Sequence, residues 1–273
     1  MYNHILITDK NHDDFKGVLP PGLSLSPERI ALGCYEDDGR ILGALSFTLT
    51  AFEYDIDWLY VVPDSRRKGI ATGLMKEFFD FIKRTGEVCP VSASFEVTPD
   101  EQSLYSFFLT VEGMDVSYSH PRYYVKHKEL VDSKELKKEL MVQFDEKLFL
   151  KLDKAEQEKI LNEVRESGVY AVKNYESWQK SCVPELCRVM YLDGKAEGTV
   201  FVLWRPDGNL EFSYIQSNNP VCTKSLINRT AADVLKFYAG CSLVFDTVVQ
   251  QAEKIAGKLF PDMEPVDIYK AEW

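Results

Sequence analysis

Residues 58–75, WLYVVPDSRRKGIATGLM, lead from a strand-like run through a short loop into a helix-like run. Pro63 ends the apolar run, and from Ile70 onward apolar residues recur at helical spacing until Gly86. The loop between the two carries three consecutive cations, Arg66, Arg67 and Lys68. Cations at the start of a helix oppose its dipole by about 0.3–1 kcal/mol each. The pattern therefore predicts a bound anion that reverses this cost.

The helix start itself has the features of a diphosphate-binding site. Backbone N–H groups are free there, and Gly69 and Ala71 let a ligand approach the backbone closely. The loop contains neither a Walker A sequence nor a Gly-x-Gly-x-x-Gly fingerprint, and a solvated basic turn that binds nothing is the alternative. The predicted anion-binding residues are Arg66, Arg67, Lys68, Gly69, Ile70, Ala71 and Thr72.

Strand and helix signals alternate on both sides of this segment. Before it, a turn-rich cluster at 36–40 separates two β-rich runs and predicts a hairpin. A third β-rich run follows and completes an antiparallel meander. The predicted strands of the first half are 30–35, 41–50, 55–61, 91–97 and 123–126. The predicted helices are 70–85 and one that opens near Pro99-Asp100 and carries Leu104, Phe107 and Phe108.

The second half repeats this order of elements after a charged, helix-prone stretch at 129–166. A hairpin (189–204), a strand (209–216), a helix, a strand (242–245), a helix and a last strand (266–269) follow one another. No cation cluster or glycine follows the strand at 209–216. We predict two domains, residues 1–130 and 131–273, with a single larger α+β domain as the alternative.

The loop resembles the signature of the GNAT acetyltransferases, Arg/Gln-x-x-Gly-x-Gly/Ala, through Arg66, Gly69 and Ala71. Val61-x-Pro63 before it and Leu74 after it also match. The resemblance covers roughly residues 1–128. It implies a mixed α+β fold of two GNAT-like domains, each a mostly antiparallel twisted sheet flanked by helices, of which the C-terminal one is degenerate and lacks the diphosphate loop.

The same resemblance implies the co-substrate and the reaction. Acetyl-CoA, or another acyl-CoA, would place its pantetheine arm along the strand formed by Leu59, Tyr60, Val61 and Val62, with Gln102 as a hydrogen-bonding partner. A primary amine would attack the thioester directly, which makes the protein an N-acyltransferase. The alternative is a catalytically inactive module that senses acyl-CoA or binds another protein.

The family pattern identifies the catalytic residues only in part. Asp55 and Asp57, two residues apart on the third strand of the meander, are the candidate proton acceptors, and Glu96 is a third choice. The tyrosine that relatives use as general acid corresponds to Leu109, which cannot donate a proton. Tyr105, one helical turn earlier, is the substitute that we consider first; Tyr123, Tyr124 and solvent are the others.

Composition limits the partners. The net charge is −11, from 43 acidic and 32 basic residues, which disfavours binding to nucleic acid or anionic lipid. There is no signal-peptide pattern and no apolar run of membrane-spanning length, so we expect a cytoplasmic protein with reduced cysteines and no metal. The expected partner is a small-molecule or peptide amine, and the expected state is a monomer or homodimer.

Overall fold

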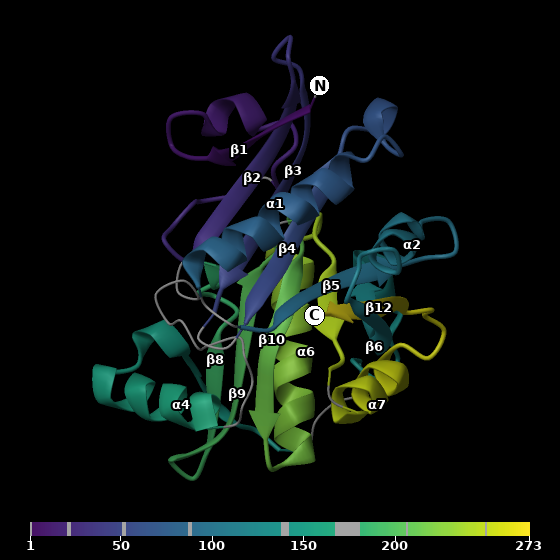
Figure 1. Ribbon diagram of the computed structural model, residues 1–273. Helices are drawn as coiled ribbons and strands as arrows, with labels where there is room; N and C mark the ends of the chain where they lie inside the picture. Colours follow the sequence, from purple (N-terminus) through teal and green to yellow (C-terminus); the bar gives the residue numbers. More distant parts are fainter. Residues whose placement is uncertain are drawn as a thin grey trace. The chain divides into compact units, whose positions relative to one another are not determined.

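The computed structural model describes residues 2–20, 23–50, 53–86, 89–137, 142–166, 181–205, 207–248 and 250–273 (Figure 1). The chain forms two compact units: Met1–Ser119 with Asp267–Trp273, and His120–Val266. Each unit combines a mostly antiparallel sheet with helices that pack on it, which confirms the predicted fold class.

The sheet of the first unit has the strand order β1-β2-β3-β4-β5-β12. All neighbouring strands are antiparallel except β4 and β5, which run parallel. The predicted meander and its following helix are therefore confirmed. The elements are β1 (Tyr2–Ile7), η1 (His12–Phe15), β2 (Arg29–Glu36), β3 (Ile41–Leu49), β4 (Tyr54–Val61), η2 (Pro63–Ser65), α1 (Ile70–Thr85), β5 (Val91–Val97), α2 (Ser103–Phe108) and β12 (Val266–Glu272).

Helix α1 packs on this sheet through one apolar stripe (Figure 1). Its buried residues recur every one to four positions and share a face of the helix. The Phe78 ring contacts Phe47 and Tyr54 of the sheet, with ring centroids 4.8 and 6.3 Å apart. The helix ends at Gly86, which has a φ of 73°. This core fixes the start of α1 next to the end of β4. The buried side chains of α1 are Ile70, Leu74, Met75, Phe78 and Ile82.

A second apolar cluster covers the other face of β1–β3. The segment that follows β1 supplies Phe15, Val18 and Leu19, which pack against Ala31 and Ala44 of the sheet. Neither β1 nor this segment is predicted from the sequence, because both are short and lack a sustained period. This cluster extends to Tyr60 of β4 and includes no residue of β5.

The sheet of the second unit has the order β11-β10-β9-β8-β7, with the last residues of β6 beside β11. Again one pair, β10 and β11, is parallel, and the other neighbours are antiparallel. The predicted hairpin, strand, helix, strand and helix occur in that order. The elements are β6 (Asp115–Val125), α3 (His127–Asp132), β7 (Asp145–Leu148), η3 (Phe149–Lys151), α4 (Lys154–Glu166), β8 (Arg188–Leu192), β9 (Lys195–Trp204), β10 (Leu210–Ser217), α6 (Pro220–Phe237), β11 (Leu243–Asp246) and α7 (Gln250–Leu259).

Three strands differ from the sequence predictions. The last strand, β12, is predicted in the second half of the chain, but it pairs with β5 of the first unit from Asp267 to Glu272. β6 begins at Asp115 rather than near residue 123, because the sheet tolerates Pro121 inside the strand. β7 lies in the charged stretch whose composition favours helix. In each case tertiary pairing overrides the local pattern.

Candidate functional site

The strands β4 and β5 separate after a short parallel contact. Residues 54–56 pair with residues 91–93, and the structure shows no further pairing between the described residues of these two strands. β4 continues to Val61, whereas residues 94–97 of β5 pair with β12 on the opposite side. This opening exposes backbone groups on one edge of β4, the strand along which the family resemblance implies that the pantetheine arm lies.

The loop from β4 to α1 bends sharply to bring cations to the helix start. Its 3-10 turn η2 is closed by a hydrogen bond from the Ser65 N–H to the Val62 carbonyl (2.9 Å). Arg67 has a φ of 63° and Gly69 a φ of 82°. A non-glycine residue at positive φ costs about 1–2 kcal/mol, so the fold maintains a strained backbone at Arg67.

The first turn of α1 leaves its backbone N–H groups without a side-chain cap. Gly69 occupies the N-cap position, no side chain caps the helix, and the first turn contains no acidic residue. A Cβ atom built at Gly69 meets nothing within 4 Å, so the space above the helix start is open. These features suit a negatively charged group.

A cavity of about 610 Å³ lies between this loop, the end of β4 and α2. Nine of the residues predicted to contact the co-substrate line it: Leu59, Tyr60, Val61, Arg66, Arg67, Gly69, Ile70, Ala71 and Thr72. Three others are not among the lining residues: Val62 packs in the opposite apolar cluster, Lys68 is exposed, and Gln102 is the N-cap residue of α2.

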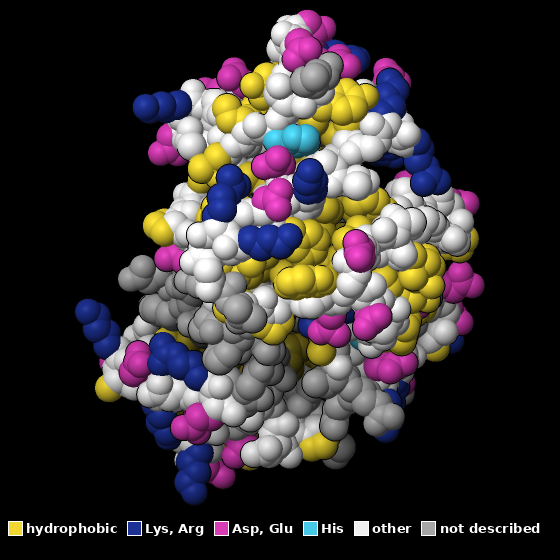
Figure 2. Space-filling view, in the orientation of Figure 1, with side chains coloured by type: hydrophobic (Ala, Val, Ile, Leu, Met, Phe, Trp, Pro, Cys, Tyr) yellow, Lys and Arg dark blue, Asp and Glu magenta, His cyan; other side chains and the backbone are white. Residues whose placement is uncertain are grey.

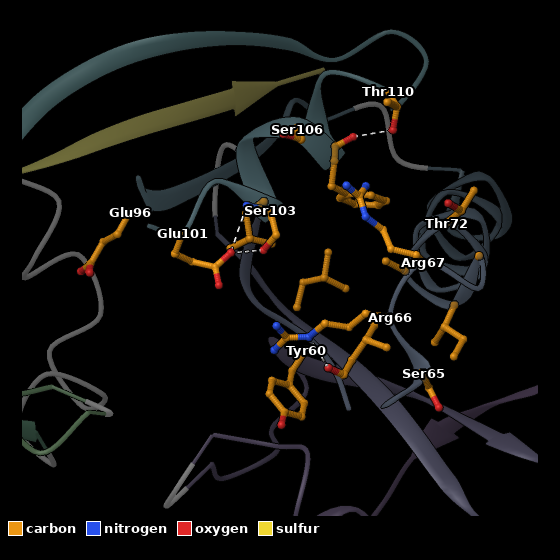
Figure 3. A pocket seen from close by; sticks show the side chains of 17 residues that line it. Tyr60, Ser65, Arg66, Arg67, Thr72, Glu96, Glu101, Ser103, Ser106 and Thr110 are labelled. Carbon is orange, nitrogen blue, oxygen red and sulfur yellow. Dashed lines mark hydrogen bonds between the residues drawn. The ribbon is translucent and has the colours of Figure 1, made fainter. Parts of the chain in front are cut away.

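Arg66 and Arg67 extend from the loop into this cavity (Figure 3). Arg66 Nε donates a hydrogen bond to the Val61 carbonyl (3.1 Å), and its guanidinium carbon lies 6.0 Å from the centre of the Tyr60 ring. Arg67 points toward α2. In the space-filling view, basic side chains stand at the upper right margin, where Figure 1 draws the loop that leads into α1 (Figure 2).

Helix α2 forms the opposite wall, which the sequence analysis did not identify. Ser103 and Ser106 of α2 line the cavity, as does Thr110 in the turn that follows the helix, and the three-residue spacing of the two serines places their hydroxyl groups on one helical face. That spacing is the signal that could have indicated the wall. Glu101 accepts hydrogen bonds from the Ser103 N–H (3.0 Å) and hydroxyl, which lower the pKa of Glu101, as does Arg66 to a smaller extent.

Asp55 is a half-buried residue at the point where β4 and β5 separate. It pairs with Ser92 across the two strands, and it points away from the core that holds Tyr54 and Ile56. Burial, together with the negative charges of Asp57 and Glu53, raises the pKa of Asp55 to about 6, against the opposing effects of Lys270 and Ser92. Asp55 is not among the residues that line the cavity.

The other two candidate carboxylates have different surroundings. Asp57 lies at a bulge of β4, where it accepts hydrogen bonds from the hydroxyls of Ser46 and Thr48 and forms an ion pair with Arg29 (3.0 Å). These contacts hold Asp57 in a structural network. Glu96 lies on the same face of β5 as Ser92, and it lines the cavity directly.

The candidate general acid is not placed in the cavity. The Tyr105 ring packs edge-on against Tyr269, with 5.0 Å between ring centres, and Tyr105 is not a lining residue. Leu109, at the position where relatives carry a tyrosine, is exposed. The structure thus brings together the predicted loop residues and Glu96, but it does not bring Tyr105 to them.

Among the described residues, no group of three or more His, Cys, Asp or Glu side chains could hold a metal ion. No described helix has the length and hydropathy that crossing a membrane requires.

Comparison with known proteins identifies similar sequences and folds. Residues 7–109 match the model of the acetyltransferase (GNAT) family. A search of curated proteins finds no match. Among solved structures, a tandem GNAT protein from the clavulanic acid biosynthesis pathway aligns over 100% of this chain and 98% of its own, with a TM-score of 0.71 and 12% identity.

Two further structures share this arrangement. A GCN5-related N-acetyltransferase from Sphaerobacter thermophilus aligns over 97% of this chain and 84% of its own, with a TM-score of 0.63 and 14% identity. A glucosamine N-acetyltransferase region of a fungal multi-domain GH3 β-N-acetylglucosaminidase covers 100% of this chain and 38% of that one, with a TM-score of 0.68 and 11% identity. At such low identities the likeness shows the tandem GNAT fold.

Proposed function

We propose that this chain, a tandem GNAT fold whose N-terminal part matches the GNAT family model, is an N-acyltransferase that uses an acyl-CoA, with acetyl-CoA as the default donor. The acceptor is a primary amine of a small molecule or peptide. The catalytic centre that we propose lies entirely in the first unit, at the cavity between β4, α1 and α2.

The observation that carries this proposal is the joining of two features in one cavity. The uncapped start of α1, with Arg66 and Arg67 beside it, suits a diphosphate, because backbone N–H groups and guanidinium groups then share one anion. The separated edge of β4 starts at the same place and suits an extended amide-containing arm. A CoA molecule carries both groups in that order.

The residues of this chain divide the binding work accordingly. Arg66, Arg67 and the N–H groups that follow Gly69 would hold the diphosphate. The backbone at Leu59 and Val61 would pair with the pantetheine amides, opposite the hydroxyl groups of α2. The bound thioester would supply an activated acyl carbon at the end of the strand opening.

In the reaction that we propose, the amine nitrogen bonds to the acyl carbon, the carbon–sulfur bond breaks and the nitrogen gives up one proton. Asp55 accepts this proton through a water molecule, because a carboxyl group with a pKa of about 6 is ionised at neutral pH. Glu96, which lines the cavity, attracts the cationic form of the acceptor, which loses one proton to solvent to become the neutral amine that attacks. Water returns a proton to the thiolate, since Tyr105 lies outside the cavity lining.

A second function is favoured by the same region. The exposed Leu109 and the packing of Tyr105 against Tyr269 leave neither of these two positions among the cavity-lining residues as a general acid. A module that binds acyl-CoA without turnover would show this combination. We rank it second because an ionisable group with a pKa in the working range lies next to the strand opening.

The test combines binding with turnover on the full chain. Isothermal titration calorimetry with CoA and acetyl-CoA measures binding, and a thiol-release assay with a panel of amines measures transfer. Binding with amine-dependent thiol release supports the acyltransferase. Binding with no release for any amine supports the sensor, and failure to bind any CoA thioester contradicts both.

A further inference from the structure

The second unit repeats the strand opening of the first. Residues 210–212 of β10 pair in parallel with residues 243–245 of β11, over the same length as the contact of β4 with β5. Beyond Phe212, the described residues of β10 have no pairing with β11. The backbone of this unit has therefore kept an opening at the position of the co-substrate site of the first unit.

A cavity of about 620 Å³ lies at this opening. The end of β10, the first turns of α6 and one side of α7 line it, and α6 runs beside β10 (Figure 1). Its apolar surface comes from Ile215, Ile227 and Ile255. Cavities of this size bind small organic molecules in many proteins.

The chemistry at the helix start excludes a diphosphate here. The Asn219 side chain accepts hydrogen bonds from the N–H groups of Val221 (3.0 Å) and Cys222 (3.4 Å), and Pro220 has no N–H. These groups are unavailable to an anion, in contrast to those of α1. The second unit therefore lacks the backbone donors that hold phosphate groups at the first.

The positive charge in this cavity comes from lysine side chains instead. Lys224 and Lys258 line it together with Glu135, whose carboxylate lies 3.8 Å from the Lys224 ammonium group. Within the part of the chain that the structure describes, no carboxylate forms an ion pair with Lys258. The lining therefore combines an apolar wall with one surplus positive charge.

We propose that this cavity binds a small carboxylate that carries an apolar chain. The carboxylate pairs with Lys258, and the chain packs against Ile215, Ile227 and Ile255. A single negative charge satisfies the surplus ammonium group, and three branched aliphatic side chains favour an alkyl group over a polar one. This proposal does not depend on acyl transfer in the first unit.

The experiment uses hexanoate as the probe and the full chain as the receptor, with ligand-observed NMR or calorimetry as the readout. We expect saturable binding of hexanoate and none of hexylamine. Affinity should rise about threefold to fourfold for each added methylene from butyrate to hexanoate. Absence of saturable binding, equal binding of hexylamine, or no dependence on chain length would overturn the proposal.

Three variants locate the site. Lys258→Met keeps the aliphatic part of the side chain and should weaken hexanoate binding about fivefold, whereas Lys236→Met, on α6 outside the cavity lining, should leave it unchanged. Arg66→Ala with Arg67→Ala should also leave it unchanged. Equal affinity in Lys258→Met and the unaltered protein, or weaker binding after the arginine substitutions, would place the carboxylate elsewhere and refute the assignment.

Discussion

The two units have the same strand opening, but the helix that follows it differs: its start has no side-chain cap in the first unit and is capped by a side chain in the second. In the first unit β4 leads to α1, whose start has no side-chain cap and carries Arg66 and Arg67. In the second, β10 leads to α6, whose start is capped by Asn219. A backbone framework that is shared between units therefore does not determine the ligand, since a few residues at the helix start decide whether an anion is attracted.

The same comparison extends to the carboxyl group in the middle of each short parallel contact. Asp55 of β4 pairs with Ser92, and Glu211 of β10 pairs with Val244. Glu211 forms an ion pair with Arg205 (2.6 Å), whereas burial, together with the negative charges of Asp57 and Glu53, raises the pKa of Asp55 to about 6. Equivalent backbone positions thus hold an ion-paired carboxylate in one unit and a carboxyl group with a raised pKa in the other.

The largest effect that we expect is on turnover, from removal of the Asp55 carboxylate. Asp55→Asn should lower kcat by about 100-fold, the lower end of what a general base contributes. The rate of the unaltered protein should rise with pH up to about 6 and then level off, because Asp55 must be ionised to accept a proton. The variant should lose this rise in a pH–rate profile of thiol release.

Glu211→Gln is the matched control at the equivalent position of the second unit. It should leave both kcat and the pH profile of thiol release unchanged, because no step of the proposed reaction uses the second unit. An unaltered profile in Asp55→Asn would show that the proton acceptor is another group, and Glu96→Gln would be the next variant to measure.

Asp55 should also affect stability in a pH-dependent way. Its pKa is higher in the folded protein, about 6, than the value near 3.9 of an unfolded chain, so the folded state holds its proton more tightly. Folded stability is therefore lost as the pH rises from 4 to 6, by at most about 3 kcal/mol. The difference in free energy of unfolding between Asp55→Asn and the unaltered protein, measured by urea unfolding, should therefore shift in favour of the variant by this amount between pH 4 and pH 8. A difference that stays constant with pH would contradict the raised pKa.

The next effect is on CoA affinity. Arg66→Ala with Arg67→Ala should raise the Kd for CoA about 10- to 100-fold, because two charge-assisted contacts to phosphate are lost. The thermal midpoint should hardly change, because exposed cations contribute little to stability. Calorimetric titration and thermal unfolding measure the two quantities.

Lys83→Ala with Arg84→Ala, at the other end of α1, removes the same charge as a control. Equal losses of CoA affinity in both double variants would show a general charge effect. That result would remove the distinction between the two helix starts on which the site assignment is based.

A smaller effect is expected from the glycine at the start of α1. Gly69 and Gly208 have nearly the same backbone conformation, with φ of 82° and 81°, and a Cβ at either position meets no neighbour within 4 Å. Alanine at each should lower the free energy of unfolding by a similar amount, about 1–2 kcal/mol. Only Gly69→Ala should also weaken CoA binding, by about tenfold, because its methyl group enters the space above the helix start. Unchanged affinity would refute the placement of the diphosphate.

The smallest effect is on the capped helix. Asn219→Ala removes the acceptor for the Val221 and Cys222 N–H groups and should lower the free energy of unfolding by about 1 kcal/mol. Asn218→Ala is the control, since Asn218 is the exposed neighbour outside the cap. Neither variant should bind CoA at a second site. A second CoA equivalent in Asn219→Ala would mean that the cap alone, and not the missing arginines, separates the two units.

Prediction from sequence was most complete where the signal is local. The periodicity of α1 and its end at Gly86 are confirmed, because an apolar stripe and a left-handed C-cap depend on neighbouring residues only. The hairpin of β2 and β3 is confirmed for the same reason. Beyond these, β1 and β7 were not found, since six- and four-residue strands carry too little pattern.

The residues of the candidate site also divide into those that the sequence could identify and those that it could not. The loop residues around Arg66 could be chosen from the sequence because they are consecutive, and nine of the predicted contacts line one cavity. The wall formed by Ser103, Ser106 and Thr110 could not, because its position opposite the loop depends on how α2 packs. The burial of Asp55 and the packing of Tyr105 against Tyr269 were equally beyond sequence reasoning.

The sequence by itself determined the strand, the basic loop and the helix that follows, because backbone conformation, charge and side-chain period are properties of consecutive residues. Only the tertiary structure decided that β12 completes the first unit, that β4 and β5 part after a short contact, and that Asp55 is half-buried where they part. The physical reason is that any strand edge can form backbone hydrogen bonds. Which edges meet, and which carboxyl groups lose their water, depends on the packing of the whole unit.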